Sequence, residues 1–398
     1  MSFAGFFHTV LLKNDGHVVA CGYNHFGQCT IPALPDGVTY SQVSAGATHT
    51  VLLKSDGDAV ACGNDGHGQC TIPALPDGVT YSQVSAGVYD HTVLLKSDGH
   101  AVMCGRNANG RRSGTIRGRS TIPDLPDGVT YSQVSAGGFH TVLLKSDGHA
   151  VACGYNAYGQ CTIPALPDGV TYSQVSAGKF FHTVLLKSDG RVVACGRNNY
   201  GQCTIPVLPD GVTYSQVSAG GDHTVLLKSD GRVVAFGNNT YGQCTTPVLP
   251  DGVTYSQVSA GLYHTVLLKS NGDVVAFGRR DHGCCRIPDL PDGVSYVSDA
   301  SLLRTDIRVL QLSFSESANG ISITCTCLSG EVHCEVMFGR SDLITGVPGR
   351  IAREIQVPKQ VLKLVLPDGY LLSSIPHSVR VQELLNHGEH PGKRRRTE

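Results

Sequence analysis

The chain has 398 residues, and its 31 Lys and Arg against 32 Asp and Glu give a formal net charge of −1. This balance argues against a global positive field that would draw the protein to nucleic acid. No run approaches about 18 apolar residues, so a membrane-spanning helix is not expected, and the length predicts two domains.

A sequence unit recurs seven times from near residue 3 to about residue 298. Each copy carries an Ala-Gly step, a short variable gap, His-Thr-Val-Leu-Leu-Lys, an Asp-Gly or Asn-Gly turn, and a Cys-Gly or Phe-Gly step. The spacing between successive copies is 41, 41, 50, 41, 42 and 41 residues, counted from the glycine of the Ala-Gly step at Gly5, Gly46, Gly87, Gly137, Gly178, Gly220 and Gly261. A period near 40 with turn signals in every unit indicates a repeat architecture. Because the first residues already belong to the first unit, we expect no secretory signal.

The fourth unit, residues 135–175, shows what each copy builds. His140–Lys145 is rich in β-branched and apolar residues, and a Ser-Asp-Gly turn separates it from the second apolar run, Ala150–Gly154. Strand, Asp-Gly turn and strand predict a hairpin, because glycine can adopt a positive φ. Another turn precedes Val170–Val175, a further predicted strand, and no helical period of 3.6 holds for ten residues. Each unit is therefore predicted to be an antiparallel sheet of about four strands.

Seven such sheets can bury their faces by packing radially, which predicts an all-β, seven-bladed β-propeller over residues 1–300. The two ends of the repeat array favour closure. The first unit lacks the Gly-Val-Thr-Tyr-Ser strand that precedes the others, and the last unit is followed by a surplus copy, Gly293–Tyr296. We expect this last strand to complete the first blade and remove the open edges.

The recurring pattern Gly-x-x-His-Thr, Asp-Gly-x-Val and Cys-Gly-x-Asn-x-x-Gly-Gln resembles the regulator-of-chromosome-condensation repeat. The resemblance covers most of the chain and implies a seven-bladed propeller, in agreement with the number of units. Members of this family usually carry Trp-Gly where this chain carries Cys-Gly or Phe-Gly. Because the chain contains no tryptophan, light sensing of the kind performed by the plant ultraviolet-B receptor of this family is excluded.

Fifteen cysteines raise the question of metal or disulfide chemistry. Eight of them form four equally spaced pairs such as Cys21 and Cys29, but Phe236 and Phe277 stand where the other units have the first cysteine. A position that accepts Cys or Phe is an apolar packing site, so we interpret these residues as buried free thiols. We expect no metal and no cofactor. The alternative is a zinc site with poor ligand spacing, at Cys325, Cys327, His333 and Cys334.

A histidine followed by threonine occurs at the same point of every unit. A catalytic group is needed once rather than seven times, so we expect each His and Thr to satisfy backbone groups within its own blade. Identical units also offer no place where an unlike acid, base and nucleophile converge, so we expect no enzyme activity.

Variation between the units concentrates in the gap before His-Thr, which in the family lines one face of the disc. Exposed aromatic side chains are costly unless a partner covers them, and aromatic anchors dominate interface energetics. The sequence therefore predicts a partner-binding ring formed by Phe6, Phe7, Tyr89, Phe139, Phe180, Phe181 and Tyr263. The alternative is drift after duplication, with the aromatic rings tucked between blades.

Two further sets of variable residues lie in predicted loops. The four residues before each Gly-Gln, such as 23–26 and 238–241, could form a second contact ring. The third unit also carries an insertion, residues 110–119, whose four arginines are accompanied by no acid and could bind phosphate or an acidic partner: Arg111, Arg112, Arg117 and Arg119. The alternative for this insertion is a tolerated surface loop.

After Ala300 the repeats stop and the pattern changes. Residues 321–327 and 332–338 predict a hairpin, 341–354 a helix, and 361–366 a further strand. This order resembles a β-grasp fold, so residues 301–385 are predicted to form a small α+β, ubiquitin-like domain. A strand at 378–382 would close its sheet.

Residues 386–398 are predicted to be a disordered basic tail. The run Lys393–Thr397 could be a nuclear import signal, and the alternative is a solvated chain end. We therefore expect a cytoplasmic protein and leave a nuclear location open.

Taken together, the sequence favours a non-enzymatic protein–protein interaction scaffold or adaptor, with ubiquitin signalling as one setting. The resemblance leaves two alternatives open: a guanine-nucleotide exchange factor for a small GTPase, and a chromatin-binding protein. The expected partner is a protein on the propeller face, either a small GTPase or a ubiquitin-pathway protein. Nucleic acid and membrane are disfavoured by the charge and the lack of a long apolar run.

Overall fold

The computed structural model describes residues 3–106, 121–291 and 293–297, together with the backbone of four strands between 308 and 365. The chain divides into two units, Met1–Asp299 and Ala300–Glu398. In the part that the structure describes, no helix is long and apolar enough to cross a membrane.

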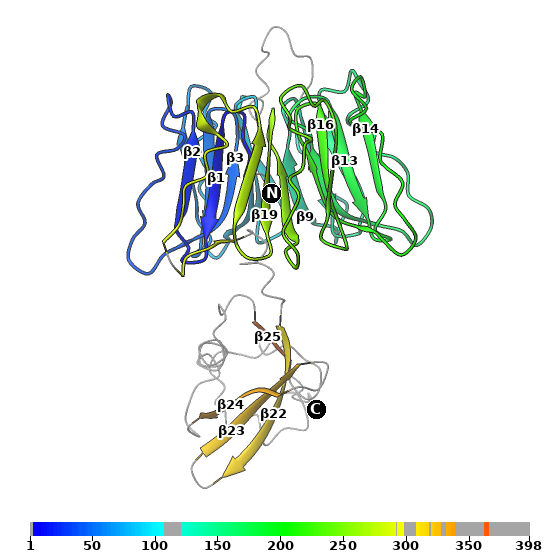
Figure 1. Ribbon diagram of the computed structural model, residues 1–398. Helices are drawn as coiled ribbons and strands as arrows, with labels where there is room; N and C mark the ends of the chain where they lie inside the picture. The colour runs from blue at the N-terminus through cyan, green and yellow to red at the C-terminus, as the bar shows by residue number, and fades with distance from the viewer. Residues whose placement is uncertain are drawn as a thin grey trace. The chain divides into compact units, whose positions relative to one another are not determined.

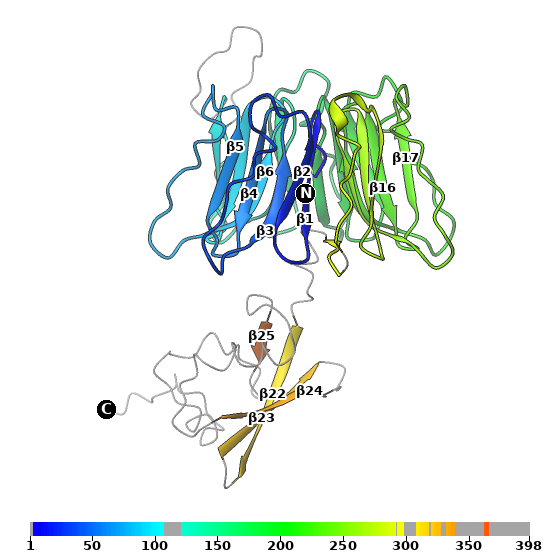
Figure 2. The ribbon, with the colours of Figure 1, turned by 60° about the vertical axis from the view of Figure 1, so that its left-hand side comes forward.

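The first unit is a seven-bladed propeller, and Figures 1 and 2 show its blades standing side by side. Every blade is a three-stranded antiparallel sheet. The first strands read Tyr-Ser-Gln-Val-Ser-Ala and are β3 (Tyr40–Ala45), β6 (Tyr81–Ala86), β9 (Tyr131–Ala136), β12 (Tyr172–Ala177), β15 (Tyr214–Ala219) and β18 (Tyr255–Ala260). First strands of successive blades contact one another, so they surround the propeller axis.

The middle strands read His-Thr-Val-Leu-Leu-Lys and are β1 (His8–Lys13), β4 (His49–Lys54), β7 (His91–Lys96), β10 (His140–Lys145), β13 (His182–Lys187), β16 (His223–Lys228) and β19 (His264–Lys269). Their first five residues are buried in every blade. A strand covered on both faces needs a continuous apolar run rather than alternation, which is what the Val-Leu-Leu segment provides.

The outer strands are β2 (Val18–Gly22), β5 (Ala59–Gly63), β8 (Ala101–Gly105), β11 (Ala150–Gly154), β14 (Val192–Gly196), β17 (Val233–Gly237) and β20 (Val274–Gly278). A short 3-10 helix, η1 (Asp281–Gly283), follows the last of them. The prediction of about four strands per unit is wrong by one. The segment where a fourth strand would lie contains prolines, such as Pro32 and Pro35 in the first unit, and a proline cannot donate to a strand ladder.

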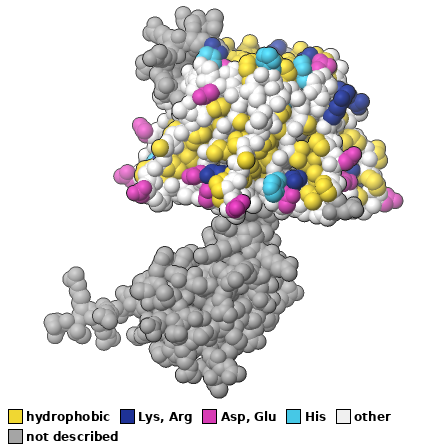
Figure 3. Space-filling view, turned by 90° about the vertical axis from the view of Figure 1, so that its left-hand side faces the viewer, with side chains coloured by type: hydrophobic (Ala, Val, Ile, Leu, Met, Phe, Trp, Pro, Cys, Tyr) yellow, Lys and Arg dark blue, Asp and Glu magenta, His cyan; other side chains and the backbone are white. Residues whose placement is uncertain are grey.

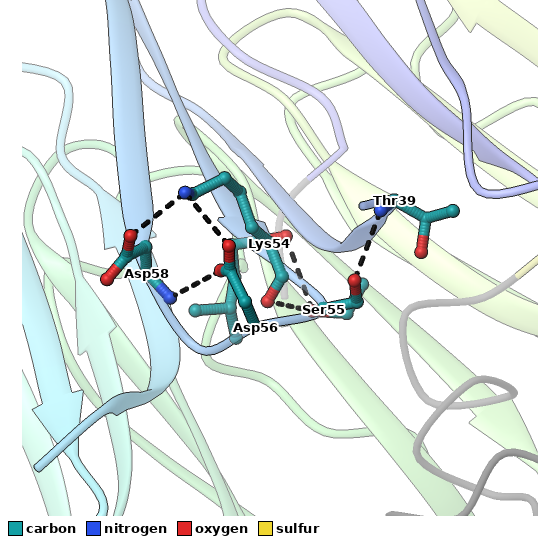
Figure 4. A network of polar contacts seen from close by, with 7 residues as sticks. Thr39, Lys54, Ser55, Asp56 and Asp58 are labelled. Carbon is teal, nitrogen blue, oxygen red and sulfur yellow. Dashed lines mark hydrogen bonds and ion pairs between the residues drawn. The ribbon is translucent and has the colours of Figure 1, made fainter. Parts of the chain in front are cut away.

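The hairpin between the middle and outer strands is closed by an Asp-Gly turn, drawn for the second blade in Figure 4. Gly57 has a φ of 88°, which favours glycine, and its N–H donates to the carbonyl of Lys54. The Lys54 Nζ lies 3.1 Å from Asp56 Oδ2 and 2.9 Å from Asp58 Oδ2. Equivalent ion pairs close the other turns at Lys13–Asp15, Lys96–Asp98, Lys145–Asp147, Lys187–Asp189, Lys228–Asp230 and Lys269–Asp273.

The prediction that the two ends of the array meet in one blade is confirmed. Strand β21 (Tyr296–Val297) pairs with β1, so the first blade has the order β2-β1-β21. Ala4 forms an antiparallel bridge with Thr9 at the other end of β1. The place of a first strand in this blade is thus shared by residues from both ends of the repeat array, which leaves the ring no open edge there.

Side chains of the first strands connect each blade to the next. The Ser44 hydroxyl accepts a hydrogen bond of 2.9 Å from the backbone N–H of Ala86, and the Gln42 side-chain oxygen accepts one from Val84 N. The serine contact recurs around the ring and closes it, since Ala4 N donates to Ser259 Oγ over 3.1 Å. The repeated Gln and Ser are therefore inter-blade connectors.

The second unit contains a four-stranded sheet of order β24-β23-β22-β25. Its strands are β22 (Arg308–Ser317), β23 (Gly320–Cys327), β24 (Val332–Phe338) and β25 (Leu362–Val365), and β25 runs parallel to β22. The predicted hairpin and the strand near 361–366 are found, whereas β22 was not predicted. The predicted helix 341–354, the closing strand 378–382 and the tail 386–398 lie outside the described residues, so a β-grasp fold stays a prediction.

Candidate protein-binding face

The variable gaps lie together at one end of the blades. Each gap joins a first strand to a middle strand, at the end where His8 pairs with Gly22 and His49 with Gly63. This end is drawn uppermost in Figure 1, and the Asp-Gly turns lie at the opposite end. The two faces of the propeller therefore carry different chemistry.

The seven predicted aromatic residues form one continuous series of ring contacts, which we call the aromatic belt. The centroids of Phe6 and Phe7 are 4.1 Å apart, and those of Phe6 and Tyr263 are 5.9 Å apart. The series continues through Tyr263–Phe180 at 6.3 Å, Phe180–Phe181 at 6.1 Å, Phe181–Phe139 at 4.8 Å and Phe139–Tyr89 at 4.1 Å. Distances of this size are those of interacting aromatic pairs.

All seven belt residues are partly exposed, neither buried nor fully open. Partner binding by these residues stays a prediction, as does the alternative of drift after duplication. The belt crosses five of the seven blades, and the second and sixth blades contribute Thr48 and Asp222 where the others have a ring.

The second variable set extends the belt outward instead of forming a separate ring. Tyr158 lies 4.8 Å from Phe181, and Tyr241 lies 5.5 Å from Tyr263, measured between ring centroids. These outer side chains are the most open large apolar groups on this face, with exposed fractions of 43% for Phe26, 49% for Tyr158, 50% for Tyr200 and 46% for Tyr241. Tyr158 and Tyr241 therefore enlarge the apolar surface that the belt begins.

Arg279 connects the belt to the outer rings. Its guanidinium carbon lies 5.4 Å from the Phe7 centroid, 5.3 Å from Tyr241 and 5.5 Å from Tyr263. Its Nε lies 2.6 Å from Asp281 Oδ2, which raises the pKa of the guanidinium and fixes its orientation. A cation held over three ring faces orders the junction between the first and seventh blades.

Asp90 forms a polar border where the third blade meets the second. It has a φ of 56°, a conformation in which Asp is one of the few favoured non-glycine residues. Its Oδ1 accepts hydrogen bonds from Gln69 Nε2 over 3.2 Å and from Thr48 Oγ1 over 3.4 Å. Its Oδ2 lies 3.6 Å from His67 Nε2. The carboxylate is thus held by three side chains of the second blade.

Asp222 plays a similar part in the sixth blade. Its Oδ1 accepts a hydrogen bond of 3.1 Å from Gln202 Nε2, and Arg197 lies 4.0 Å away. Burial raises the pKa of this carboxyl group, and the charge of Arg197 opposes the shift. Sequence reasoning missed Asp90, Asp222 and Arg279 as parts of this face, although the gap and loop sets that were singled out contain all three.

The repeated His-Thr step connects blades, which corrects the expectation that it acts within one blade. Thr50 Oγ1 donates to the carbonyl of Gln28 over 2.7 Å, so it accepts from His8 Nε2, which lies 2.9 Å away. The imidazole is therefore protonated on Nε2. Equivalent His–Thr pairs are His49–Thr92, His140–Thr183, His182–Thr224, His223–Thr265 and His264–Thr9.

Burial lowers the pKa of all seven histidines, to about 3 for His8, His49, His140 and His223 and to about 4 for His91, His182 and His264. They are neutral at physiological pH and serve as structural hydrogen-bond donors. The ring of pairs has a gap between the third and fourth blades, where His91 Nε2 and Thr141 Oγ1 have no hydrogen-bond partner in the structure.

The cysteines of the described residues are free thiols. Most are partly buried rather than fully buried, and burial raises the pKa of Cys21, Cys62 and Cys195 to about 12. Phe236 pairs with Thr224 as Cys62 pairs with Thr50, so the two residue types occupy equivalent positions. No group of three metal-binding side chains occurs within the described ranges.

Two sets of predicted residues cannot be placed. The insertion with Arg111, Arg112, Arg117 and Arg119 lies outside the described residues. So do the side chains of Cys325, Cys327, His333 and Cys334, although the backbone register sets Cys325 opposite Cys334.

Comparison with known proteins identifies the repeat. The family profile described as the regulator of chromosome condensation (RCC1) repeat matches the chain seven times, at residues 3–28, 40–69, 81–111, 131–160, 172–202, 214–243 and 255–284. No curated protein has a matching sequence.

Solved structures show the same fold at low sequence identity. Prp20p from Saccharomyces cerevisiae, described with its binding properties to Gsp1p and histones, is 15% identical, and the match covers 76% of this chain and 88% of Prp20p with a TM-score of 0.57. Yeast RCC1 (Prp20) bound to Kap60 is 18% identical over 66% of this chain and 76% of its own, with a TM-score of 0.53. Human WBSCR16 is 21% identical over 67% of this chain and 83% of its own, with a TM-score of 0.54.

Proposed function

Because the chain belongs to the regulator of chromosome condensation repeat family, we propose that it is a non-enzymatic scaffold whose aromatic belt binds a protein partner. The single observation that carries this proposal is the continuity of the belt from Phe7 to Tyr89. Large, rigid, partly exposed rings in one contiguous patch are the anchors that dominate protein interfaces.

The arrangement of the belt supports binding rather than catalysis. Its members are all aromatic, and the neighbouring charged groups Arg279 and Asp222 are held by Asp281 and Gln202 within the same face. The repeated step, His-Thr, forms hydrogen bonds between blades, as in His8–Thr50 and His49–Thr92. The repeated residues thus build the scaffold, and the variable ones differ where a partner would contact it.

The test compares two double variants, each of which removes two apolar side chains from the surface. Phe139→Ala with Phe181→Ala removes the central stack of the belt. The control, Val207→Ala with Val248→Ala, removes side chains that are each 97% exposed and lie outside the belt. After circular dichroism confirms that both proteins fold, a partner captured by cross-linking with the unaltered protein is purified and titrated against each variant.

We expect the belt variant to lose at least tenfold in affinity and the control to bind as the unaltered protein does. Equal affinity of all three proteins would refute the proposal. A photo-cross-linking residue at position 181 adds a direct readout, since it should label the partner where one at position 207 does not.

A small GTPase is the second candidate partner, because the structure of Prp20p is described with its binding to Gsp1p. A sequence identity of 15% supports a shared fold and nothing further, so nucleotide-exchange activity stays a separate hypothesis. It is tested by the release of a fluorescent guanine nucleotide from purified GTPases in the presence of this protein. An unchanged release rate with every GTPase would leave the scaffold proposal as it stands and remove this candidate.

A chromatin protein is the third candidate, and the face opposite the belt carries the supporting observation. The Asp-Gly turns and the Pro-Asp-Gly loops there expose aspartates such as Asp58, Asp77 and Asp168, and acidic side chains gather along the lower edge of the propeller in Figure 3. Such a face would attract a basic protein such as a histone. Binding to histones that weakens steeply with salt would support this candidate, and the absence of binding at low salt would remove it.

A further inference from the structure

The seventh unit carries two adjacent cysteines at a step where other units carry glutamine followed by cysteine. The first, second, fourth, fifth and sixth units read Gly-Gln-Cys, whereas the seventh reads Gly283-Cys284-Cys285. The third unit has its insertion at this point of the sequence. Among the six units that keep the step, only the seventh therefore sets two thiols side by side.

The glutamine that Cys284 replaces holds its loop in the other units. In the first unit the Gln28 side-chain oxygen accepts a hydrogen bond of 3.0 Å from the backbone N–H of Phe26. The same contact is made by Gln69, Gln160, Gln202 and Gln243. A cysteine side chain does not extend far enough to make it. In the seventh unit His282, which stands in the place of Phe26, adopts a φ of 63° within η1, so this loop is built differently from its equivalents.

Both sulfur atoms of the seventh loop face one backbone oxygen. Cys284 Sγ lies 3.2 Å from the carbonyl oxygen of Arg279, and Cys285 Sγ lies 3.4 Å from the same atom. In five other loops a single thiol occupies this place, as Cys244 Sγ does 3.4 Å from Asn238 O. The two thiols also hydrogen-bond to each other, which lowers the pKa of Cys284 and raises that of Cys285. They are therefore close enough to bond to one and the same atom.

We propose that Cys284 and Cys285 form a two-thiol binding site for a trivalent arsenical, a thiophilic metalloid compound that bonds to two sulfurs at once. Soft sulfur ligands select soft centres and disfavour hard cations such as Mg²⁺ and Ca²⁺. In the part of the chain that the structure describes, no third metal-binding side chain is grouped with the pair. Two sulfurs alone suit such a compound better than they suit zinc, which takes four ligands. The inference is independent of the belt's function.

Binding is a condensation that needs no oxidant. An arsenical of the form R–As(OH)₂ gains one As–S bond to each cysteine, each S–H proton leaves with one hydroxyl as water, and the arsenic stays trivalent. Cys285 is partly exposed, whereas Cys284 is only 2% exposed, so we expect the first As–S bond to form at Cys285. The second bond then closes within one molecule, which makes the pair bind far more tightly than a single thiol does.

The experiment uses the full, reduced chain and phenylarsine oxide, which hydrates to an arsenical of this form. Mass spectrometry of the intact protein counts the bound arsenicals, and titration with a thiol reagent counts the cysteines that binding removes. We expect the site to lose two thiols for each arsenical bound. A competing dithiol, 2,3-dimercaptopropanol, should release the arsenical at concentrations where a monothiol has no effect.

Cys284→Gln is the decisive variant, because it restores the residue of five other units and leaves Cys285 in place. It should bind one arsenical fewer per chain, with the affinity of the remaining thiol about a hundredfold lower or weaker still. Cys244→Ser is the matched control, since it removes a single thiol from the equivalent place in the sixth unit. This control should bind as the unaltered protein does.

A second pair of cysteines has to be separated from this site. The backbone register of the second unit sets Cys325 opposite Cys334, so all titrations are repeated with Cys325→Ser added. If Cys284→Gln then binds the arsenical as tightly and in the same amount as its parent, the proposal is overturned. Loss of only one thiol per arsenical would overturn it as well. Cys285→Ser, which also leaves one thiol, gives the same comparison should circular dichroism show that Cys284→Gln does not fold.

Discussion

The imidazole Nε2 of His8 lies 2.9 Å from the hydroxyl of Thr50 across the boundary between the first and second blades. Six such contacts run around the propeller, each between a buried, neutral histidine and a buried threonine. Protonation of one of these histidines would place a positive charge on a buried imidazole, where the loss of solvent disfavours it most. The repeated step that builds the propeller therefore also makes its stability depend on pH.

We predict acid unfolding centred well above the pKa of a carboxyl group. Each His has a pKa near 3 to 4 when folded and about 6.5 when unfolded, so the unfolded chain binds more protons between these values. Stability is then full above pH 6.5 and falls as pH falls, by about 2 kcal/mol per histidine at pH 5. Urea unfolding followed from pH 8 to pH 5 measures this loss.

The number of protons that the chain takes up on unfolding tests whether the histidines cause this pH dependence. His140→Gln should reduce the slope of unfolding free energy against pH by about one proton, or about 1.4 kcal/mol per pH unit below pH 6.5. A slope that stays unchanged in this variant would show that the histidines do not govern the acid transition.

A matched pair of variants separates the hydrogen bond from the packing of the ring. His140 donates to Thr183 over 2.8 Å, whereas His91 and Thr141 have no hydrogen-bond partner through Nε2 and Oγ1. Both histidines are 1% exposed, so replacing either by Ala leaves a similar cavity. We expect His140→Ala to cost about 1 kcal/mol more than His91→Ala, because only the former breaks a buried hydrogen bond. Equal losses in chemical denaturation would contradict this assignment.

The closing strand should hold the two ends of the repeat array together. Tyr296 is 5% exposed, pairs with Lys13 and donates its hydroxyl to the carbonyl of Pro288 over 2.7 Å. Tyr296→Ala should therefore destabilise the propeller by about 3–5 kcal/mol. Hydrogen exchange should accelerate first in β1 and β2.

Tyr172→Ala is the internal comparison, since Tyr172 occupies the equivalent place in the fifth blade and donates to Pro164. Its loss should accelerate exchange around β12 and β13 and leave β1 protected. The same exchange pattern in both variants would mean that closure at β21 has no local role.

The repeat period made the main features of the fold predictable. Seven units with an Asp-Gly or Asn-Gly turn each, and a surplus Gly293–Tyr296 copy, indicated seven blades and the closing strand. The position of the aromatic belt also followed, because equivalent gaps of a closed ring lie on one face.

Contacts between units could not be derived in the same way. A local period shows that His8 and Thr9 are adjacent, but which blade supplies the partner depends on the angle between sheets, which no sequence spacing records. Lys179 shows the same limit. It stands in a variable gap beside the belt residues Phe180 and Phe181, yet its side chain is only 2% exposed, which the spacing of the sequence does not indicate.

Arg279 provides the last prediction, because it connects the belt to the outer rings through contacts with Phe7, Tyr241 and Tyr263. Arg279→Ala should weaken binding of the captured partner about tenfold, since the rings lose the cation that orders them. Arg279→Lys should retain only part of the affinity for the partner. An ammonium group cannot stack on an aromatic ring and at the same time donate sideways to Asp281, as the guanidinium does. Arg280→Ala changes the same charge at an exposed neighbour and should bind normally. If Arg280→Ala weakens binding as much as Arg279→Ala does, the effect comes from overall charge, and the ordered junction of the belt plays no part in recognition.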